Sequence, residues 1–222
     1  PVPTGSIVGY TNAGKSSLLH ALTDADVLIE DKLFATLDPT TRRIELSGGA
    51  EVLLTDTVGF VQNLPHDLVD AFKSTLEETQ YSDFIIHVID ANHPDVQQCY
   101  NTTMEVLDSL DCLDKPMILV CNKIDLVDDL FNLHVITEKH EQVIRMSVTE
   151  GIGFEELFDA IREILYRIYP LVTYRLPLDR YDIVALMRRS GTVQSEKFED
   201  ETIIVKAQLP ERLTRSLREF AV

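Results

Sequence analysis

The sequence has no tryptophan, only three cysteines and no long apolar run, and these shortages restrict what the 222-residue chain can be. Its cysteines, Cys99, Cys112 and Cys121, are odd in number and lack C-x-x-C spacing, so neither a disulfide framework nor a zinc site is indicated. No apolar segment approaches the roughly 20 residues of a membrane-spanning helix, and no signal segment opens the chain. We therefore expect no membrane span and a cytoplasmic location.

Basic residues are also scarce, since 20 Lys and Arg stand against 37 Asp and Glu, for a net charge of −17. Residues 1–168 carry 11 basic and 29 acidic side chains, whereas residues 169–222 carry 9 and 8. A surface this acidic repels nucleic acid, so any nucleic-acid contact is expected to be local. Because the chain begins at Pro1 and a strand pattern follows at once, we interpret it as a fragment of a longer protein. We expect this fragment to be monomeric.

Short apolar runs alternate with amphipathic segments through residues 1–168, which predicts βαβ units. The expected strands are residues 6–8, 42–46, 51–56, 84–90, 117–122 and 143–148. One expected helix begins directly after residue 16. Three others cover residues 66–81, 95–110 and 155–168. Since Ser47-Gly48-Gly49-Ala50 reads as a hairpin turn, the predicted fold class is α/β, a mostly parallel, doubly wound sheet with one antiparallel edge strand.

The pattern changes after Pro170. A strand at residues 171–176, a helix at 179–189 and a hairpin of residues 193–198 and 203–208 are expected. Pro210 then opens a final helix that carries Leu213, Leu217 and Phe220 on one face. Residues 169–222 therefore read as a small α+β domain.

A glycine-rich loop follows the first expected strand and runs into a helix, and it fits G-x-x-x-x-G-K-[ST]. Its N–H groups and the helix N-terminus can cradle a polyphosphate, while Lys15 reaches the β- and γ-phosphates and Ser16 ligates Mg²⁺. The alternative is a chance glycine loop. The residues expected around the phosphates are Gly9, Tyr10, Thr11, Asn12, Ala13, Gly14, Lys15, Ser16 and Ser17.

A D-x-x-G pattern, Asp56-Thr57-Val58-Gly59, ends a later strand. The carboxylate can hold Mg²⁺ through its water shell, and the N–H of Gly59 can contact a γ-phosphate. Alone, the pattern is common in ordinary turns. Here it follows the phosphate loop by one hairpin, which favours the nucleotide interpretation.

An N-K-x-D pattern, Asn122-Lys123-Ile124-Asp125, lies at the end of the expected strand of residues 117–122. Asp125 can accept from both the ring N1–H and the exocyclic amine of guanine, a pairing that adenine cannot offer. Asn122 can meet the other base edge, and the stem of Lys123 can pack over the ring. A backbone N–H in the following strand end would contact the guanine oxygen, within Ser147, Val148 and Thr149. Together the motifs predict binding of GTP and GDP.

These motifs, in order at successive strand ends, resemble those of the translation-factor-related GTPases. More narrowly, the phosphate loop with residues 33–40 (LFATLDPT), 56–60 (DTVGF) and 64–68 (LPHDL) is similar to the HflX family of ribosome-associated GTPases. The resemblance implies a Ras-like P-loop GTPase domain in residues 1–168 and a small C-terminal domain in residues 169–222. It also implies an N-terminal region with nucleotide and ribosome contacts, expected to be missing here.

Residue by residue, the resemblance places the switch threonine at Thr36, after Phe34 and Ala35, at 56 − 36 = 20 positions before Asp56. Its hydroxyl and carbonyl would close on Mg²⁺ and the γ-phosphate, which makes Ser16, Thr36 and Asp56 the expected metal ligands. Thr40 and Thr41 compete for the role. The alternative is that they only cap the next strand.

Phe60 stands where Ras-like enzymes place a glutamine that orients water. Because an apolar ring cannot polarise water, we expect slow intrinsic hydrolysis that a partner accelerates. Gln62 and His66 are nearby polar candidates, with a solvated glutamine and a first-turn histidine as the ordinary interpretations.

Asn12 supports a sharper hypothesis. Related GTPases with Asn-Ala-Gly-Lys-Ser in this loop use that asparagine to hold K⁺, which supplies the charge of an arginine finger. The alternative is that Asn12 only tolerates a strained backbone angle.

Three arginines of the final expected helix, Arg212, Arg215 and Arg218, share a side opposite its apolar face, and Arg188-Arg189 end the preceding helix. A solvated polar face is the ordinary interpretation. In so acidic a protein, however, these are the groups expected to meet ribosomal RNA or protein.

The sequence thus predicts a Mg²⁺-dependent GTP hydrolase with Lys15, Thr36, Gly59 and Asn12 at the reacting phosphate. The resemblance implies a switch acting on the large ribosomal subunit, in splitting or rescue of ribosomes or in subunit assembly. One rival is a signalling-type switch that acts on protein effectors without a ribosome. Another is a GTPase module coupled to RNA modification, which needs a fused catalytic domain that residues 169–222 do not resemble.

Overall fold

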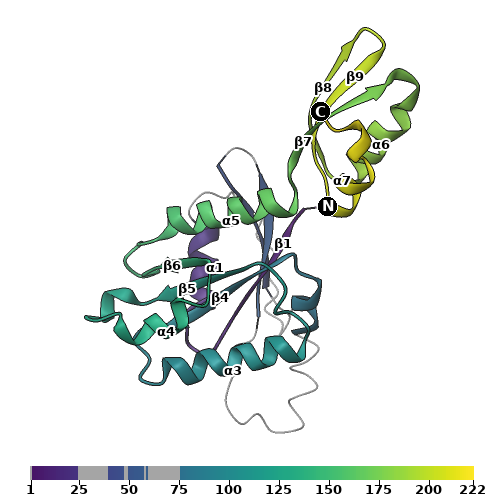
Figure 1. Cartoon of the computed structure of the whole chain (residues 1–222). Coiled ribbons are helices and arrows are strands. Elements are labelled where there is room, and N and C mark those ends of the chain that lie inside the picture. The colour runs from purple at the N-terminus through teal and green to yellow at the C-terminus, as the bar shows by residue number, and fades with distance from the viewer. Residues whose placement is uncertain (1, 25–39, 48–49, 58, 60–75) are drawn as a thin grey trace. The chain divides into compact units, whose positions relative to one another are not determined.

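The computed structural model describes residues 2–24, 40–47, 50–57, 59 and 76–222. The chain divides into two compact units, one of residues 3–161 and one of residues 162–222 with the first residues of the chain (Figure 1). None of the described helices combines the length and the apolar character needed to cross a membrane.

The first unit is built on a six-stranded sheet in the order β2-β3-β1-β4-β5-β6. Its strands are β1 Thr4–Gly9, β2 Thr40–Glu45, β3 Glu51–Asp56, β4 Phe84–Asp90, β5 Met117–Asn122 and β6 Gln142–Arg145. Strands β2 and β3 pair antiparallel, and all other pairs in this sheet are parallel. The predicted α/β class and its antiparallel edge strand are confirmed.

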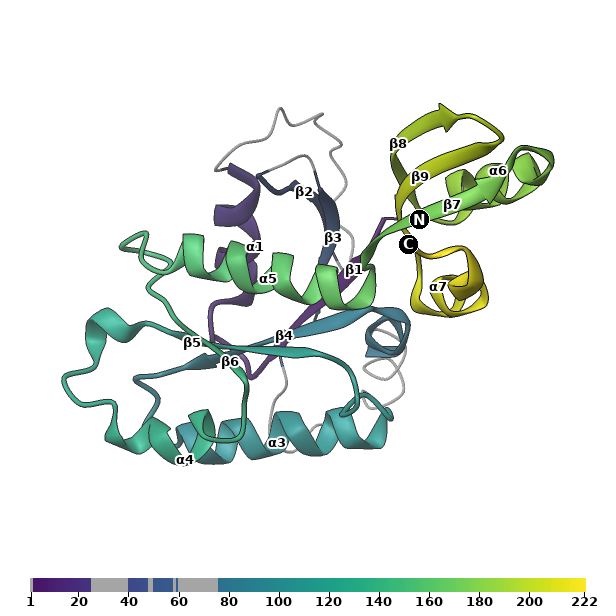
Figure 2. The same ribbon diagram turned by 45° about the horizontal axis from the view of Figure 1, so that its top comes forward.

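Helices cover both faces of this sheet, so its central strands are apolar along almost their whole length. They are α1 Lys15–Asp24, α3 Val96–Ser109, α4 His134–Thr137 and α5 Phe154–Ile168, with short 3₁₀ helices η1 Ile124–Leu126 and η2 Phe131–Leu133. α1 and the first half of α5 lie on one face, and α3 and α4 on the other (Figure 2). Of the helix expected at residues 66–81 the structure describes 76–81, which are helical.

The second unit is an antiparallel sheet of three strands in the order β7-β9-β8, with helices packed on it. In chain order its elements are β7 Leu171–Pro177, η3 Leu178–Arg180, α6 Tyr181–Ser190, β8 Thr192–Glu199, β9 Thr202–Gln208, α7 Glu211–Ser216 and η4 Arg218–Phe220. Its core joins sheet residues such as Tyr174 and Val205 to Met187 of α6.

The final helix is shorter than the sequence predicts. α7 ends at Ser216, and the chain continues through η4 to Ala221, which bridges to Tyr174, and to Val222, whose N–H donates to Thr173 O. The end of the chain must become extended to join β7, and a longer helix would prevent this. The predicted apolar face is confirmed, because Leu217 is buried and Leu213 and Phe220 pack against the core.

A histidine lies in the middle of β4, fully buried. The ring of His87 stacks on Tyr100 with centroids 5.3 Å apart and planes 6° from parallel, and neither ring nitrogen has a hydrogen-bond partner among the described residues. Burial, with the nearby charges of His140 and Lys15, lowers the pKa of His87 to about 3. The folded protein therefore holds this ring neutral.

We predict that His87 makes the first unit acid-sensitive. Its folded pKa of about 3 lies below the ordinary value of 6.5, so between these values the unfolded chain binds the extra proton. Its contribution to stability is complete above 6.5 and is lost as the pH falls. Lowering the pH from about 7.5 to about 5.5 should cost the wild type about 1.4 kcal/mol more unfolding free energy than His87→Leu, measured by urea unfolding and circular dichroism. Equal losses would contradict the prediction.

Candidate functional site

The phosphate loop connects β1 to α1, and its two glycines are fixed by neighbouring strands. A Cβ on Gly9 would lie 2.2 Å from Val88 O of β4. Gly14 has φ +104°, and a Cβ there would lie 2.3 Å from Asn122 Nδ2. Any other side chain at these positions would push the loop off the strands beside it.

Three charged and polar groups meet at the start of α1. Lys15 is 6% exposed, and its Nζ donates to Tyr10 O at 3.1 Å. Ser16 Oγ donates to Asp56 Oδ2 at 2.6 Å, while Asp56 Oδ1 is buried without a partner among the described residues. Burial lowers the pKa of Lys15, which Asp56 opposes, and burial raises the pKa of Asp56, which the bond from Ser16 and the charge of Lys15 oppose.

This arrangement fits a polyphosphate with a divalent cation. A buried ammonium needs an anion, and the unpartnered Oδ1 of Asp56 needs a cation or a donor. A hydroxyl and a carboxylate are oxygen ligands of the kind that Mg²⁺ prefers. The two side chains lie together and have the chemistry of metal ligands, and their role as ligands stays a prediction.

The D-x-x-G segment packs directly on the phosphate loop. Thr57 donates to Ile7 O through both its Oγ1, at 2.7 Å, and its backbone N–H, at 3.2 Å. A Cβ on Gly59 would lie 2.9 Å from Lys15 Nζ and from Thr11 Cα. The glycine therefore lies beside the Lys15 ammonium as the motif requires, whereas the buried Thr57 side chain anchors the segment to β1.

Asn122 joins two loops. Its side chain is buried, its Nδ2 donates to Ala13 O at 3.0 Å, and its Oδ1 accepts from the N–H of Val148 at 3.2 Å. The sequence predicts that Asn122 meets the base edge. In the structure its amide holds the phosphate loop and the loop after β6 in a fixed relation, and the contact with the base edge stays a prediction.

The other two specified residues of N-K-x-D, Lys123 and Asp125, have different environments. Lys123 has φ 65°, and its Nζ donates to Asn12 O at 2.9 Å and to Asp90 Oδ2 at 2.6 Å. Asp125 lies in η1, is exposed, and has no hydrogen-bond or ion-pair partner among the described residues. Its carboxylate can therefore accept both donors of guanine.

The loop after β6 has few donors left for a base. The N–H of Ser147 donates to Ile152 O, its Oγ accepts from the N–H of Glu150, and the N–H of Val148 is bound to Asn122. Among the described residues, the N–H of Thr149 has no partner. Within Ser147, Val148 and Thr149, it is thus the donor available for the guanine oxygen.

Asn12 has the left-handed angle φ 61°, and its carbonyl accepts from Lys123. The strained backbone that the sequence analysis gave as the alternative is therefore present. Asparagine tolerates this region better than most residues because its side chain is short and polar.

Asp90 was missed by the sequence analysis. It ends β4 directly beside Asn122, the last residue of β5, and makes an ion pair with Lys123. Its Oδ1 also accepts from the N–H of Asn92 at 2.9 Å. The available signal was an acidic residue at the carboxyl end of a buried strand, the same signal that pointed to Asp56.

Several predicted site residues lie outside the described residues. They are Phe34, Ala35, Thr36, Val58, Phe60, Gln62 and His66. Their roles remain predictions from the sequence.

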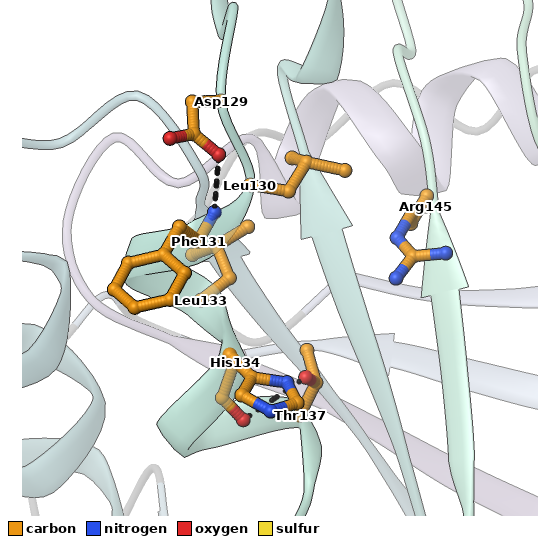
Figure 3. A pocket seen from close by; sticks show the side chains of 7 residues that line it. All are labelled: Asp129, Leu130, Phe131, Leu133, His134, Thr137 and Arg145. Atoms are coloured by element: carbon orange, nitrogen blue, oxygen red, sulfur yellow. Dashed lines mark hydrogen bonds between the residues drawn. The ribbon is translucent and has the colours of Figure 1, made fainter.

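A cavity of about 300 Å³ lies beside β6, and none of its lining residues belongs to the four motifs. Figure 3 shows Phe131 and Arg145 on opposite sides of it, with Asp129 accepting from the N–H of Phe131. The remaining lining residues are Leu130, Leu133, His134 and Thr137.

The fold and the four loops at the carboxyl ends of its strands define a P-loop nucleotide-binding domain of the Ras-like GTPase class. A family model described as 50S ribosome-binding GTPase matches residues 4–123, and the chain belongs to this family.

Relatives named GTPase HflX match nearly the whole chain. The protein from Caldanaerobacter subterraneus subsp. tengcongensis is 43% identical over 100% of this chain and 50% of its own length. The protein from Akkermansia muciniphila is 47% identical over 99% and 51%. The HflX resemblance is confirmed, and the chain spans about half the length of these curated relatives.

A solved structure supports the fold. A GTP-binding protein from Sulfolobus solfataricus in complex with GDP has a TM-score of 0.62 and 32% sequence identity, covering 73% of this chain and 52% of that one.

We predict that Asp90→Asn weakens nucleotide binding through Lys123. Without the partly buried carboxylate, the Lys123 ammonium loses the group that holds it against Asn12 O. The Kd for GDP should rise roughly five- to tenfold, equivalent to about 1 kcal/mol. Fluorescent GDP titration measures it, with Asp108→Asn on the exposed surface of α3 as the charge-matched control. An unchanged Kd in Asp90→Asn would contradict the role.

Proposed function

We propose that the protein is a Mg²⁺-dependent GTP hydrolase that acts as a nucleotide switch on the large ribosomal subunit. The observation that supports it most is the meeting of four loops at one sheet edge. There Lys15 and the Ser16–Asp56 pair can bind phosphates and their cation, and the exposed carboxylate of Asp125 can bind a guanine.

The reaction is in-line attack of water on the γ-phosphate of GTP. Lys15 neutralises charge on the β- and γ-oxygens, and the N-terminus of α1 adds its dipole. Ser16 and Asp56, with Thr36 in the triphosphate state, would hold Mg²⁺, which would supply further positive charge to the phosphates. The N–H of Gly59 contacts the γ-phosphate and so distinguishes GTP from GDP.

Hydrolysis is slow without a partner. Phe60 cannot orient water, and the nearby Gln62 and His66 have ordinary interpretations as a solvated glutamine and a first-turn helix histidine. The activating partner supplies the missing group when the switch is engaged.

Guanine is selected by the base loops. Asp125 accepts from N1–H and the exocyclic amine, and the N–H of Thr149 donates to the guanine oxygen. Adenine would leave these groups unpaired, and this lowers the binding affinity more than a difference in ligand size does.

The ribosomal setting rests on the family description, 50S ribosome-binding GTPase, and on what the resemblance to the HflX family implies. It includes a cytoplasmic location, ribosome splitting, rescue or assembly as the task, and a functional domain boundary where α5 ends at residue 168. Arg212, Arg215 and Arg218 are candidates for the ribosomal contact within this setting. The signalling-type switch is the remaining alternative.

Nucleotide-dependent sedimentation tests the proposal. We expect the full-length protein to sediment with purified large subunits in a non-hydrolysable GTP analogue and less so in GDP. Asp125→Asn supplies the control, because its amide can pair with the 2-carbonyl of xanthine but opposes the amine of guanine. The variant should lose roughly 100-fold in GTP affinity and sediment only with the xanthosine analogue.

Two results separate the parts of the proposal. If the wild type binds the GTP analogue but stays in the supernatant, the ribosomal role fails and the effector switch is favoured. If Asp125→Asn keeps its preference for guanine, the base site is misassigned.

We predict that K⁺ accelerates hydrolysis through Asn12. The rate should be roughly tenfold higher in K⁺ than in Na⁺, which corresponds to about 1.4 kcal/mol of barrier. Asn12→Gly is the informative variant, because glycine adopts φ 61° without strain whereas alanine does not. The variant should fold and bind GDP but hydrolyse at one rate in both salts. Equal rates in the wild type would remove the hypothesis.

A further inference from the structure

Three cations share one face of the C-terminal sheet. Arg175 of β7 and Lys197 of β8 are both paired with Ile204 on the central strand β9, one from each side. Lys206 follows Ile204 by two residues on β9 and so points to the same face. All three cationic side chains are exposed.

The opposite face of this sheet is the core. Tyr174, Leu176, Ile203, Val205 and Ala207 alternate with the residues above and are fully buried. They pack with residues of α6 and α7, the helices labelled beside this sheet in Figure 1. Because successive side chains alternate, the cations lie on the face away from these helices, which we call the open sheet face.

The cations of the open sheet face are not neutralised. Within residues 171–222, the ion pairs described are Arg180–Asp182, Arg188–Glu196 and Arg215–Glu211, and each involves α6, α7 or the turn before α6. Arg175, Lys197 and Lys206 have no ion-pair or hydrogen-bond partner among the described residues. The carboxylate of Glu199 shares their face at the hairpin end, which leaves an excess of positive charge.

The shape and chemistry of this face match a polyanion. Two strand spacings separate Arg175 from Lys197, about 10 Å, and Lys206 is offset along β9 by about 7 Å. Thr173 and Ser195 flank Lys206 across the strands and add hydroxyl donors. Such a grid of cations and hydroxyls suits successive phosphate groups of a nucleic-acid backbone.

We infer that the open sheet face binds the phosphate backbone of RNA. The rest of the chain is strongly acidic and repels RNA, so this face offers a local attraction in a protein of net charge −17. The inference rests on the proposed function, since ribosomal RNA is what a GTPase on the large subunit meets. The inference places the contact on the sheet and not on Arg212 and Arg215 of α7 and Arg218 of η4, of which Arg215 is already paired with Glu211.

Two charge-matched triple variants of the full-length protein test it. The sheet variant replaces Arg175, Lys197 and Lys206 by Gln, and the helix variant replaces Arg212, Arg215 and Arg218 by Gln. Binding is measured at several KCl concentrations to purified large subunits and to protein-free large-subunit RNA. Circular dichroism checks the fold. Intrinsic GTP hydrolysis, in which none of these residues takes part, checks the nucleotide site.

Each phosphate contact contributes about 0.7–0.9 to the slope of log K against log salt. The sheet variant should therefore reduce the slope of log K against log salt by about 2–3, both with large subunits and with protein-free RNA. The helix variant should reduce it by less than about 1. If the sheet variant does not fold, Lys206→Gln alone should lower it by about 1.

Three results would overturn the inference. They are an unchanged slope in the sheet variant, a larger loss in the helix variant than in the sheet variant, and a loss on subunits with no binding to protein-free RNA. The last would identify an acidic protein as the partner. A wild type that binds RNA with the expected slope but never sediments with subunits would reject the proposed function and leave the inference standing.

Discussion

The side-chain amide of Asn122 is the contact on which the geometry of the nucleotide site depends. It donates to Ala13 in the phosphate loop, 109 residues away in sequence, and accepts from Val148 in the base loop. Lys123 reinforces the connection by donating to Asn12 and Asp90. Because the parallel strands all end at this edge, two residues fix the distance between the phosphate loop and the loops proposed to bind the base. A nucleotide then bridges loops that are already in place.

Desolvation is the second constraint. The Lys15 ammonium and the Asp56 carboxylate are both withdrawn from water, which lowers the pKa of the first and raises that of the second. Their mutual attraction and the bond from Ser16 offset only part of this cost. A polyphosphate would neutralise the Lys15 ammonium, and a divalent cation would neutralise the Asp56 carboxylate. Binding of both would therefore relieve the desolvation of the two buried charges. The same burial that disfavours the isolated charges makes their interaction with phosphate strong.

The two units divide the electrostatic work. Residues 1–168 carry 29 acidic and 11 basic side chains, so the surface of the nucleotide unit repels anions in general, while the buried ammonium of Lys15 attracts them at the phosphate loop. The C-terminal unit has nearly balanced charge, but its sheet separates the charges, with ion pairs on the helix side and unpaired cations on the open sheet face. A small sheet with helices on one side can present a flat charged surface without exposing its core.

Much of the molecule was determined by the sequence alone. Apolar runs predicted the strands, and the glycine-rich turn predicted the antiparallel edge strand. The motifs identified Lys15, Ser16, Asp56 and Asp125. Each of these features depends on residues that are close together in the sequence. Tertiary structure decided the rest. Asn122 serves the loops, Asp90 holds Lys123, His87 is buried neutral, and Arg175, Lys197 and Lys206 share a face. Each of these depends on which distant segments are brought into register, and local sequence carries no measure of that distance.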